Sequence, residues 1–319
     1  LEEGCMPRYL PLKGNKISYC EASCDLTNPI KMRGMDGVLY DLSCSTDGSE
    51  QHPTNVILLK QKLENGKLFA FDQDIDAQQN YIDDTRLVLI TQNFRFIKKF
   101  LRLEGIHEVD GVLADLGVSS YQFDTPERGF STREDGDLDM RMNREQELSA
   151  KSVVNNYELN KLSRIFRKFG ELKNAYVLAK SIVNYREEKV ILTTEDLKDA
   201  VKEHVPTHKK NKILAQLFQA IRIEVNDEIN ALKDMLSQSV DLLKKGGRLS
   251  VISYHSLEDR LVKNLIKSGN FEGEIEKDFY GVPKFVLNSI NSKPITATKE
   301  ELDSNPRSRS AKLRVGQKV

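Results

Sequence analysis

The sequence has no tryptophan and only four cysteines, which all fall within the first 44 residues, at Cys5, Cys20, Cys24 and Cys44. No Cys-x-x-Cys pair or histidine cluster accompanies these cysteines, so we expect free thiols and no metal site. The sequence also lacks any run of eighteen apolar residues, and its first residues, LEEGCMPRYLPLKG, contain no hydrophobic signal core. We therefore expect a cytoplasmic protein that does not enter a membrane.

An excess of charge of either sign is missing too. The 48 lysines and arginines balance 48 aspartates and glutamates, so the formal net charge is zero. Overall charge therefore gives no indication of a nucleic-acid partner, and any such surface must be a local patch. The length of 319 residues suits one large or two ordinary domains, and a hydrophobic fraction of 39% is enough for a core.

Short apolar strands alternate with helical stretches in the first part of the chain. We expect strands at 37–42, 67–72, 86–91 and 109–115, with a helix at 96–101 before the fourth strand. This alternation indicates a parallel, doubly wound sheet with helices on both faces. The sequence therefore predicts an α/β protein with a Rossmann-like, nucleotide-binding sheet.

Acidic residues end two of these strands. Ligands of parallel sheets bind beyond the carboxyl ends of the strands, so Asp72 and Asp115 are placed at a candidate site. A carboxylate at the end of the second strand can accept hydrogen bonds from ribose hydroxyls, which is the role we expect for Asp72. The alternative for both residues is that they only cap the helix that follows.

Four long motifs make the sequence similar to a known family. They are DLGVSS-x-Q-x-D-x-x-ERGFS-x-R-x-DG-x-LDMRM at 115–142, FQAIRIEVNDEI at 218–229, GGRLSVISYHSLEDRLVK at 246–263 and NPRSRSAKLRV at 305–315. In this order they resemble the ribosomal RNA small-subunit methyltransferase H family, over the chain from about residue 63 to its end. The resemblance implies a class I methyltransferase sheet that binds S-adenosylmethionine and methylates the exocyclic N4 amine of one cytosine in 16S ribosomal RNA.

The resemblance also implies which residues bind the cofactor: Asp72, Phe94, Asp115 and Gln122, with the glycine-loop position falling loosely near Gly48. An aromatic residue after the third strand can pack on adenine, although Phe94 could equally belong to the core. Gln122 could hydrogen-bond the cofactor or be an ordinary polar loop residue.

The sequence departs from the family before its first good match. The segment 41–52, where the family has a run of glycines ending in Gly-His, holds a single glycine, and 19–22 stands where the family has His-x-Pro. Either the first sixty residues have diverged, or the loop has degenerated and the chain is a catalytically weakened relative that binds ribosomal RNA without methylating it. A nicotinamide-dependent dehydrogenase is disfavoured because G-x-G-x-x-G is absent.

The pattern becomes purely helical between the first and second motifs. We expect residues 1–124 and 218–319 to form a discontinuous methyltransferase domain, with an inserted helical substrate-recognition subdomain at 125–217. The expected helices are marked by Leu159, Leu162, Ile165, Phe166 and Phe169; by Tyr176, Ala179, Ile182 and Val183; and by Leu197, Ala200 and Val201 after a cap at Thr193 or Thr194.

In the family, an inserted subdomain of this kind is thought to help hold the RNA. Cations gather in it at Arg164, Arg167 and Lys168, and again at Lys202, His204, His208, Lys209, Lys210 and Lys212. These clusters could contact phosphates, and the alternative is an ordinary solvated helix face.

The last part of the chain is expected to return to the sheet. A helix at 221–243 should end at Gly246 and Gly247, and a strand at 248–253 should bring residues 254–256 to the same edge as Asp115. His255 there could relay a proton, contact RNA or orient the loop. We expect the segments at 285–287 and 312–315 to form a final antiparallel pair.

The expected chemistry requires oxygen acceptors. The amine of cytosine is a poor nucleophile because its lone pair is delocalised into the ring, so the enzyme must hold it near the methyl carbon and accept hydrogen bonds from its hydrogens. The candidate catalytic residues are Asp115, Ser119, Ser120 and His255. The base must leave any stack to reach the methyl group. The expected partner is 16S ribosomal RNA or the small subunit, without a metal, and a homodimer is compatible with the sequence.

Overall fold

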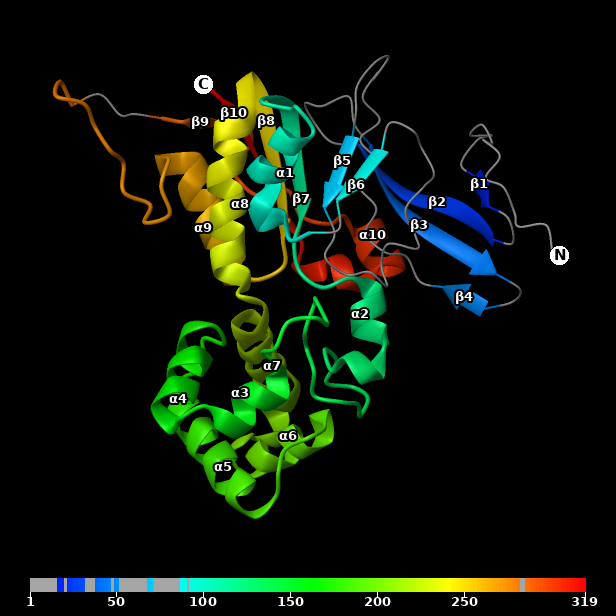
Figure 1. The fold of residues 1–319 in the computed structure, drawn as a ribbon, viewed down its shortest axis with the longest axis vertical. Helices are drawn as coiled ribbons and strands as arrows, with labels where there is room; N and C mark the ends of the chain where they lie inside the picture. The colour runs from blue at the N-terminus through cyan, green and yellow to red at the C-terminus, as the bar shows by residue number, and fades with distance from the viewer. Residues whose placement is uncertain are drawn as a thin grey trace. The chain divides into compact units, whose positions relative to one another are not determined.

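The computed structural model describes residues 16–19, 22–31, 38–46, 49–51, 68–71, 87–90, 92–281 and 285–319. The chain divides into two compact units, which are described separately below (Figure 1). The first unit comprises Leu1–Ser120 and Leu232–Val319, and the second comprises Tyr121–Ala231.

The first unit contains a four-stranded sheet in the order β7-β8-β10-β9 (Figure 1). These strands are β7 (Val109–Asp115), β8 (Leu243–Ser253), β9 (Leu287–Ser289) and β10 (Lys312–Lys318). β7 runs parallel to β8, whereas β10 is antiparallel to both β8 and β9. An antiparallel pair thus forms near the end of the chain as expected, but it joins 287–289 with 316–318, so the expected bounds of 285–287 and 312–315 are wrong.

The second and third expected strands also form, as β5 (Leu68–Phe71) and β6 (Leu87–Ile90), and they pair in parallel. Phe69 and Phe71 of β5 pack against the main hydrophobic cluster of this unit. This cluster draws its buried side chains from α1 (Ile97–Leu103), α8 (Glu228–Leu242), α9 (Ser256–Ser268) and strand β8. The unit is therefore a mixed α/β structure.

The expected first strand forms, but not in a parallel sheet. β3 (Val38–Thr46) lies between β2 (Ala22–Lys31) and β4 (Ser49–Gln51), both antiparallel to it, and β1 (Lys16–Tyr19) pairs with β2. The prediction of a parallel first strand at 37–42 followed by a loop is therefore wrong. A segment with one glycine and several β-favouring residues can continue as a strand where a glycine run would turn.

The expected helix at 221–243 is two helices. α7 (Lys210–Asn226) ends at Asp227, whose φ of 49° is left-handed, and α8 follows at once. The hydrophobic spacing continues across this break, so periodicity alone could not reveal it. β8 then begins at Leu243, earlier than expected, and its pairing with β7 shifts register between Val109 and Gly111.

The second unit, all of whose residues are described, is helical. Its helices of seven residues or more are α3 (Ala150–Asn156), α4 (Leu159–Lys168), α5 (Ala175–Glu188), α6 (Thr194–Val201) and α7. Leu162, Ile165 and Phe166 are buried in α4 as expected. Tyr176 in α5 is 49% exposed, so its expected place on the buried face is wrong.

Capping residues define where α6 begins. Thr193 is its N-cap and forms a capping box with Asp196, which confirms one of the two expected caps. Hydrogen bonds and the ion pair with Lys189 hold the pKa of Asp196 below its ordinary value, although burial acts in the opposite direction.

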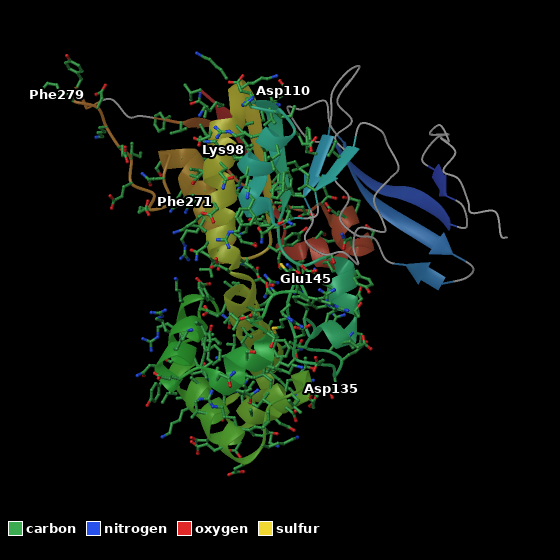
Figure 2. The ribbon with its side chains drawn as sticks, viewed as in Figure 1. Lys98, Asp110, Asp135, Glu145, Phe271 and Phe279 are labelled. Atoms are coloured by element: carbon green, nitrogen blue, oxygen red, sulfur yellow. The ribbon has the colours of Figure 1, made fainter. Side chains whose placement is uncertain are left out.

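A segment after α9 leaves the sheet. Phe271 is partly buried against the hydrophobic cluster, whereas Phe279 is 97% exposed at the far end of this segment (Figure 2).

Within the described part of the chain, no helix has both the length and the apolar character needed to span a membrane.

Candidate functional site

The parallel pairing of β7 with β8 brings two loops to one edge of the sheet. Asp115, the last residue of β7, pairs with Ile252 of β8, and the backbone N–H of Leu116 donates to the carbonyl of Ile252 at 3.1 Å. The residues that follow each strand are therefore neighbours. This confirms the expectation that residues 254–256 reach the same edge as Asp115.

Asp115 is half-buried at this edge. The next helix, α2 (Ser120–Asp124), begins five positions later, so Asp115 does not stand at its N-cap. Between them the chain turns at Gly117, whose φ is 98°, and a Cβ there would lie 3.5 Å from the ring of Tyr254. The loop after β7 thus turns against the loop after β8, and the carboxylate is not used as the cap of the following helix.

The other candidates near Asp115 have different surroundings. Ser119 is half-buried in the loop, and Ser120 is the first residue of α2. Gln122 lies in α2 and is only 4% exposed. It is therefore not an ordinary polar loop residue, which would be exposed and outside a helix.

Phe94 begins the short 3₁₀ helix η2 (Phe94–Phe96) after β6. The residue is half-buried and packs against the hydrophobic cluster of the first unit, in agreement with the core alternative. Asp72 and Gly48 lie outside the described residues, so their expected roles stay predictions.

His255 is the N-cap of α9. Its Nδ1 accepts a hydrogen bond from the backbone N–H of Glu258 at 3.4 Å. The Glu258 carboxylate accepts in return from the backbone N–H groups of Tyr254, at 2.9 Å, and His255, at 3.3 Å. This reciprocal arrangement favours the loop-orienting role of His255, and the proton-relay role stays a prediction.

Asp259, the residue of α9 after Glu258, links this helix to strand β10. Asp259 accepts from Nε of Arg314 at 2.6 Å and lies 3.4 Å from Nζ of Lys312, both on β10. Burial would raise the pKa of Asp259, but these two cations hold it below its ordinary value. The sequence interpretation did not identify Glu258 or Asp259. The His-x-x-Glu spacing of a capping box at 255–258 was the available signal.

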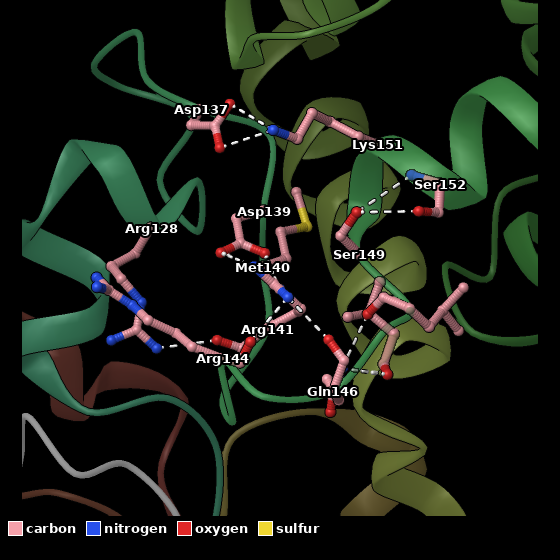
Figure 3. Close-up of polar contacts among 12 residues, drawn as sticks. Arg128, Asp137, Asp139, Met140, Arg141, Arg144, Gln146, Ser149, Lys151 and Ser152 are labelled. Atoms are coloured by element: carbon pink, nitrogen blue, oxygen red, sulfur yellow. Dashed lines mark hydrogen bonds and ion pairs between the residues drawn. The ribbon is translucent and has the colours of Figure 1, made fainter.

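The middle of the first motif is an irregular segment of the second unit, held by side-chain hydrogen bonds (Figure 3). Nη2 of the fully buried Arg128 donates to the carbonyl of Arg141 at 2.9 Å. Arg141 pairs with Asp139 at 2.5 Å and donates to the carbonyls of Arg144 and Gln146, each at 2.8 Å. These charged residues therefore have structural partners within their own unit.

The first and second motifs meet through one amide. The side chain of Asn226 donates to the carbonyl of Met140 at 2.8 Å and accepts from the N–H of Met142 at 2.7 Å. Two segments that are 84 residues apart are joined in this way, which explains why an asparagine closes α7.

The cations of α4 form an exposed face, defined by Lys161, Arg164, Arg167 and Lys168. Lys161 and Lys168 lie over the rings of Tyr157 and Phe169. Arg164 and Arg167 have no hydrogen-bond or ion-pair partner among the residues that the structure describes. Their charges are thus available to a ligand. Lys209, Lys210 and Lys212 near the start of α7 are exposed as well.

Comparison with known proteins identifies the family. The model of the MraW methylase family matches residues 22–319. The chain belongs to this family. Its members are methyltransferases that use S-adenosylmethionine as the methyl donor. The mixed α/β structure is consistent with a class I methyltransferase.

Individual members of the MraW methylase family are about half identical to the chain. A protein of Flavobacterium johnsoniae is 54% identical over 284 residues, which are 89% of this chain and 92% of the relative. Proteins of Flavobacterium psychrophilum and Christiangramia forsetii are each 52% identical, over 89% of this chain and 95% and 92% of their own lengths. All three are named ribosomal RNA small subunit methyltransferase H.

The described residues fit the cofactor of the MraW family. Asp115 offers a half-buried carboxylate at the end of a parallel strand, and the positive φ of Gly117 lets the backbone turn sharply beside it. Phe94 is a half-buried aromatic residue after β6. The similarity to methyltransferases over most of the chain does not favour the alternative of a relative that binds RNA without methylating it.

Proposed function

We propose that the chain transfers a methyl group from S-adenosylmethionine to the exocyclic N4 amine of a cytosine in 16S ribosomal RNA. The observation that carries this proposal is the pairing of β7 with β8, which sets Asp115 beside residues 254–256 in a member of the MraW methylase family. The names of the relatives support the small ribosomal subunit, or its RNA, as the partner. The reaction would then take place in the cytoplasm, and a homodimer is compatible with it.

In this proposal the oxygens at the sheet edge orient the amine. S-adenosylmethionine supplies, when bound, a methyl group activated by its attachment to a sulfonium. The Asp115 carboxylate accepts a hydrogen bond from the amine, which aligns the nitrogen with the methyl carbon and increases its electron density. The hydroxyls of Ser119 and Ser120 are further acceptors for the base in this scheme.

The proposed cofactor contacts follow the strand ends. Asp72 would hold the ribose, Phe94 would pack against the adenine, and Gln122 would donate or accept at the cofactor. The position of Gly48 would be a further cofactor contact. The half-buried state of Phe94 leaves room for such a contact, whereas Gln122 is only 4% exposed and its role rests on the resemblance alone.

We also propose that residues 125–217 form an inserted subdomain that holds the RNA, while 1–124 and 218–319 form the methyltransferase domain. The compact helical unit Tyr121–Ala231 supports this division. The exposed cationic face of α4 supports phosphate contact, because Arg164 and Arg167 have no partner among the described residues that would neutralise them.

Substitution of Asp115 tests the proposal. Asp115→Ala and Asp115→Asn should each lower the rate of methyl transfer to small subunits by about 100-fold or more, because each removes the negatively charged acceptor. Transfer is measured with radiolabelled S-adenosylmethionine, and cofactor affinity and melting temperature are measured in parallel.

Asp110→Asn is the matched control, because Asp110 lies at the other end of the same strand, where it is exposed and pairs with Lys244 at 2.9 Å. It should leave the rate unchanged. Full activity in a folded Asp115→Asn variant would contradict the site assignment. Failure of the folded wild-type chain to bind S-adenosylmethionine in a calorimetric titration would instead favour the RNA-binding relative.

A further inference from the structure

Both nitrogens of the His255 ring have defined surroundings. Nδ1 accepts the N–H of Glu258 at 3.4 Å, and an accepting nitrogen carries no proton. The neutral ring therefore carries its proton on Nε2, and this tautomer follows from the hydrogen-bond partner of Nδ1. Nε2 in turn lies 3.3 Å from Oε1 of Glu258.

Glu258 uses its carboxylate to hold the end of β8. Its Oε2 accepts from two successive backbone N–H groups, those of Tyr254 and His255, and the residue is only 4% exposed. An ionised carboxylate makes stronger hydrogen bonds of this kind than a neutral group does. The backbone at 254–255 is therefore fixed by α9 from one side.

This fixed segment contacts the loop that follows Asp115. The ring of Tyr254 lies 3.5 Å from the position of a Cβ on Gly117, and Leu116 is hydrogen-bonded to Ile252 at 3.1 Å. A shift of Tyr254 would be transmitted to Gly117, two residues after the proposed acceptor. A displacement of about 1 Å at such a site can reduce a rate by about 100-fold.

We propose that His255 and Glu258 are positioning residues for the methyl transfer, and that His255 does not accept the proton released by the amine. This inference rests on the function proposed above. In the reaction, the bond between the methyl carbon and sulfur breaks as the bond to N4 forms, and the nitrogen then loses one proton. His255 could accept that proton only at Nδ1, which would break the cap of α9. The inference therefore assigns this proton to an acceptor other than His255.

Two substitutions of His255 separate positioning from proton transfer. His255→Ala removes the cap and should lower kcat by about 10- to 100-fold, with a small effect on the affinity for S-adenosylmethionine. His255→Asn should restore most of the lost kcat, because asparagine is among the best N-cap residues and its Oδ1 can accept the N–H of Glu258. Asparagine has no titratable nitrogen, so it cannot relay a proton.

Glu258→Gln should lower kcat in the same range as His255→Ala, because the two backbone N–H groups lose a charged acceptor. Thr298→Ala is the matched control. Thr298 is exposed and caps α10 (Lys299–Ser304) by accepting from the N–H of Glu301 at 3.2 Å, so its substitution removes a helix cap at another place in the same unit. It should lower the melting temperature slightly and leave kcat unchanged.

Equal losses of kcat in the alanine and asparagine variants, with folding and cofactor affinity intact, would overturn the inference. So would full activity in His255→Ala or in Glu258→Gln. An inactive wild-type chain would overturn the proposed function, and this inference with it. The two failures are therefore distinguishable in one set of assays on small subunits.

Discussion

At position 136 the backbone passes so close to itself that only glycine fits. A Cβ on Gly136 would lie 1.9 Å from the carbonyl oxygen of Pro126, and one on Gly129 would lie 2.3 Å from that of Asp137. Both atoms in the way belong to the backbone, so no side-chain movement can relieve the collision. The two glycines thus allow the two sides of this loop in the second unit to pack together.

We predict that Gly136→Ala lowers the free energy of unfolding by more than about 3 kcal/mol, beyond the usual range for single substitutions. Gly105→Ala is the control, because Gly105 has a positive φ of 75° but nothing within 4 Å of its Cβ position. That variant should lose only about 1–2 kcal/mol, the cost of the left-handed conformation. Denaturant unfolding measures both, and a loss at Gly136 no larger than that at Gly105 would contradict the steric explanation.

Residues whose role depends on neighbours in the sequence could be predicted, and residues whose role depends on distant contacts could not. The cap at Thr193 and the strand end at Asp115 follow from local patterns and are confirmed as such. The collision at Gly136 and the bridge made by Asn226 involve backbone groups 10 and more than 80 residues away in the chain. No local pattern indicates such partners.

At the scale of elements, the break between α7 and α8 is the clearest departure from the sequence pattern. Asp227 adopts a φ of 49°, and its Oδ1 accepts from the side chain of Asn230 at 2.6 Å. Aspartate tolerates the left-handed region better than most residues do, because its short polar side chain can hydrogen-bond locally. The apolar spacing on either side stays in phase, so the sequence predicted one helix.

Substitution of Asp227 measures the cost of this break. Asp227→Gly should stay within about 1 kcal/mol of the wild type, because glycine adopts the left-handed conformation freely. Asp227→Val should lose at least about 1–2 kcal/mol, since a β-branched side chain collides with its own backbone there. The free energies of unfolding of the two variants are measured by denaturant titration and compared with that of the wild type. If valine proves as stable as glycine, the left-handed conformation does not define the helix boundary.

At the scale of the whole molecule, the alternation of strands and helices predicted a mixed α/β protein, and the long helical stretch predicted a region without strands. What the sequence could not give is the partner of each strand. β3 was expected in a parallel sheet and is antiparallel, because strand direction depends on which segment the strand meets. The start of β8 could not be predicted for the same reason. Its first residue, Leu243, pairs with Val109 of β7, and the register shifts before the pairing resumes at Arg248 and Gly111.

If residues 125–217 hold the RNA and the methyltransferase domain binds the cofactor, substitutions on α4 should weaken RNA binding without changing cofactor binding. Arg164→Glu combined with Arg167→Glu should weaken binding to small-subunit RNA and reduce the slope of log affinity against log salt by about two, one for each lost phosphate contact. Cofactor affinity should not change. Filter binding at several salt concentrations and calorimetry provide the two measurements.

Lys267→Glu combined with Lys299→Glu is the control for net charge, because both lysines are exposed in the first unit and the charge change is the same. An equal loss of RNA affinity in both double variants would show that net charge, and not the face of α4, determines binding.

β7 and its parallel partner β8 are far apart in the sequence, and this distance determines the order in which parts of the growing chain can fold. β7 ends at Asp115 and β8 begins at Leu243, so the whole unit Tyr121–Ala231 is synthesised between them. At about 5–20 residues per second, β8 follows β7 from the ribosome by roughly 10 seconds. The helices of the second unit, whose contacts are closer in sequence, can fold within that interval. The edge that carries Asp115 is completed only afterwards, so this enzyme becomes competent late in its own synthesis.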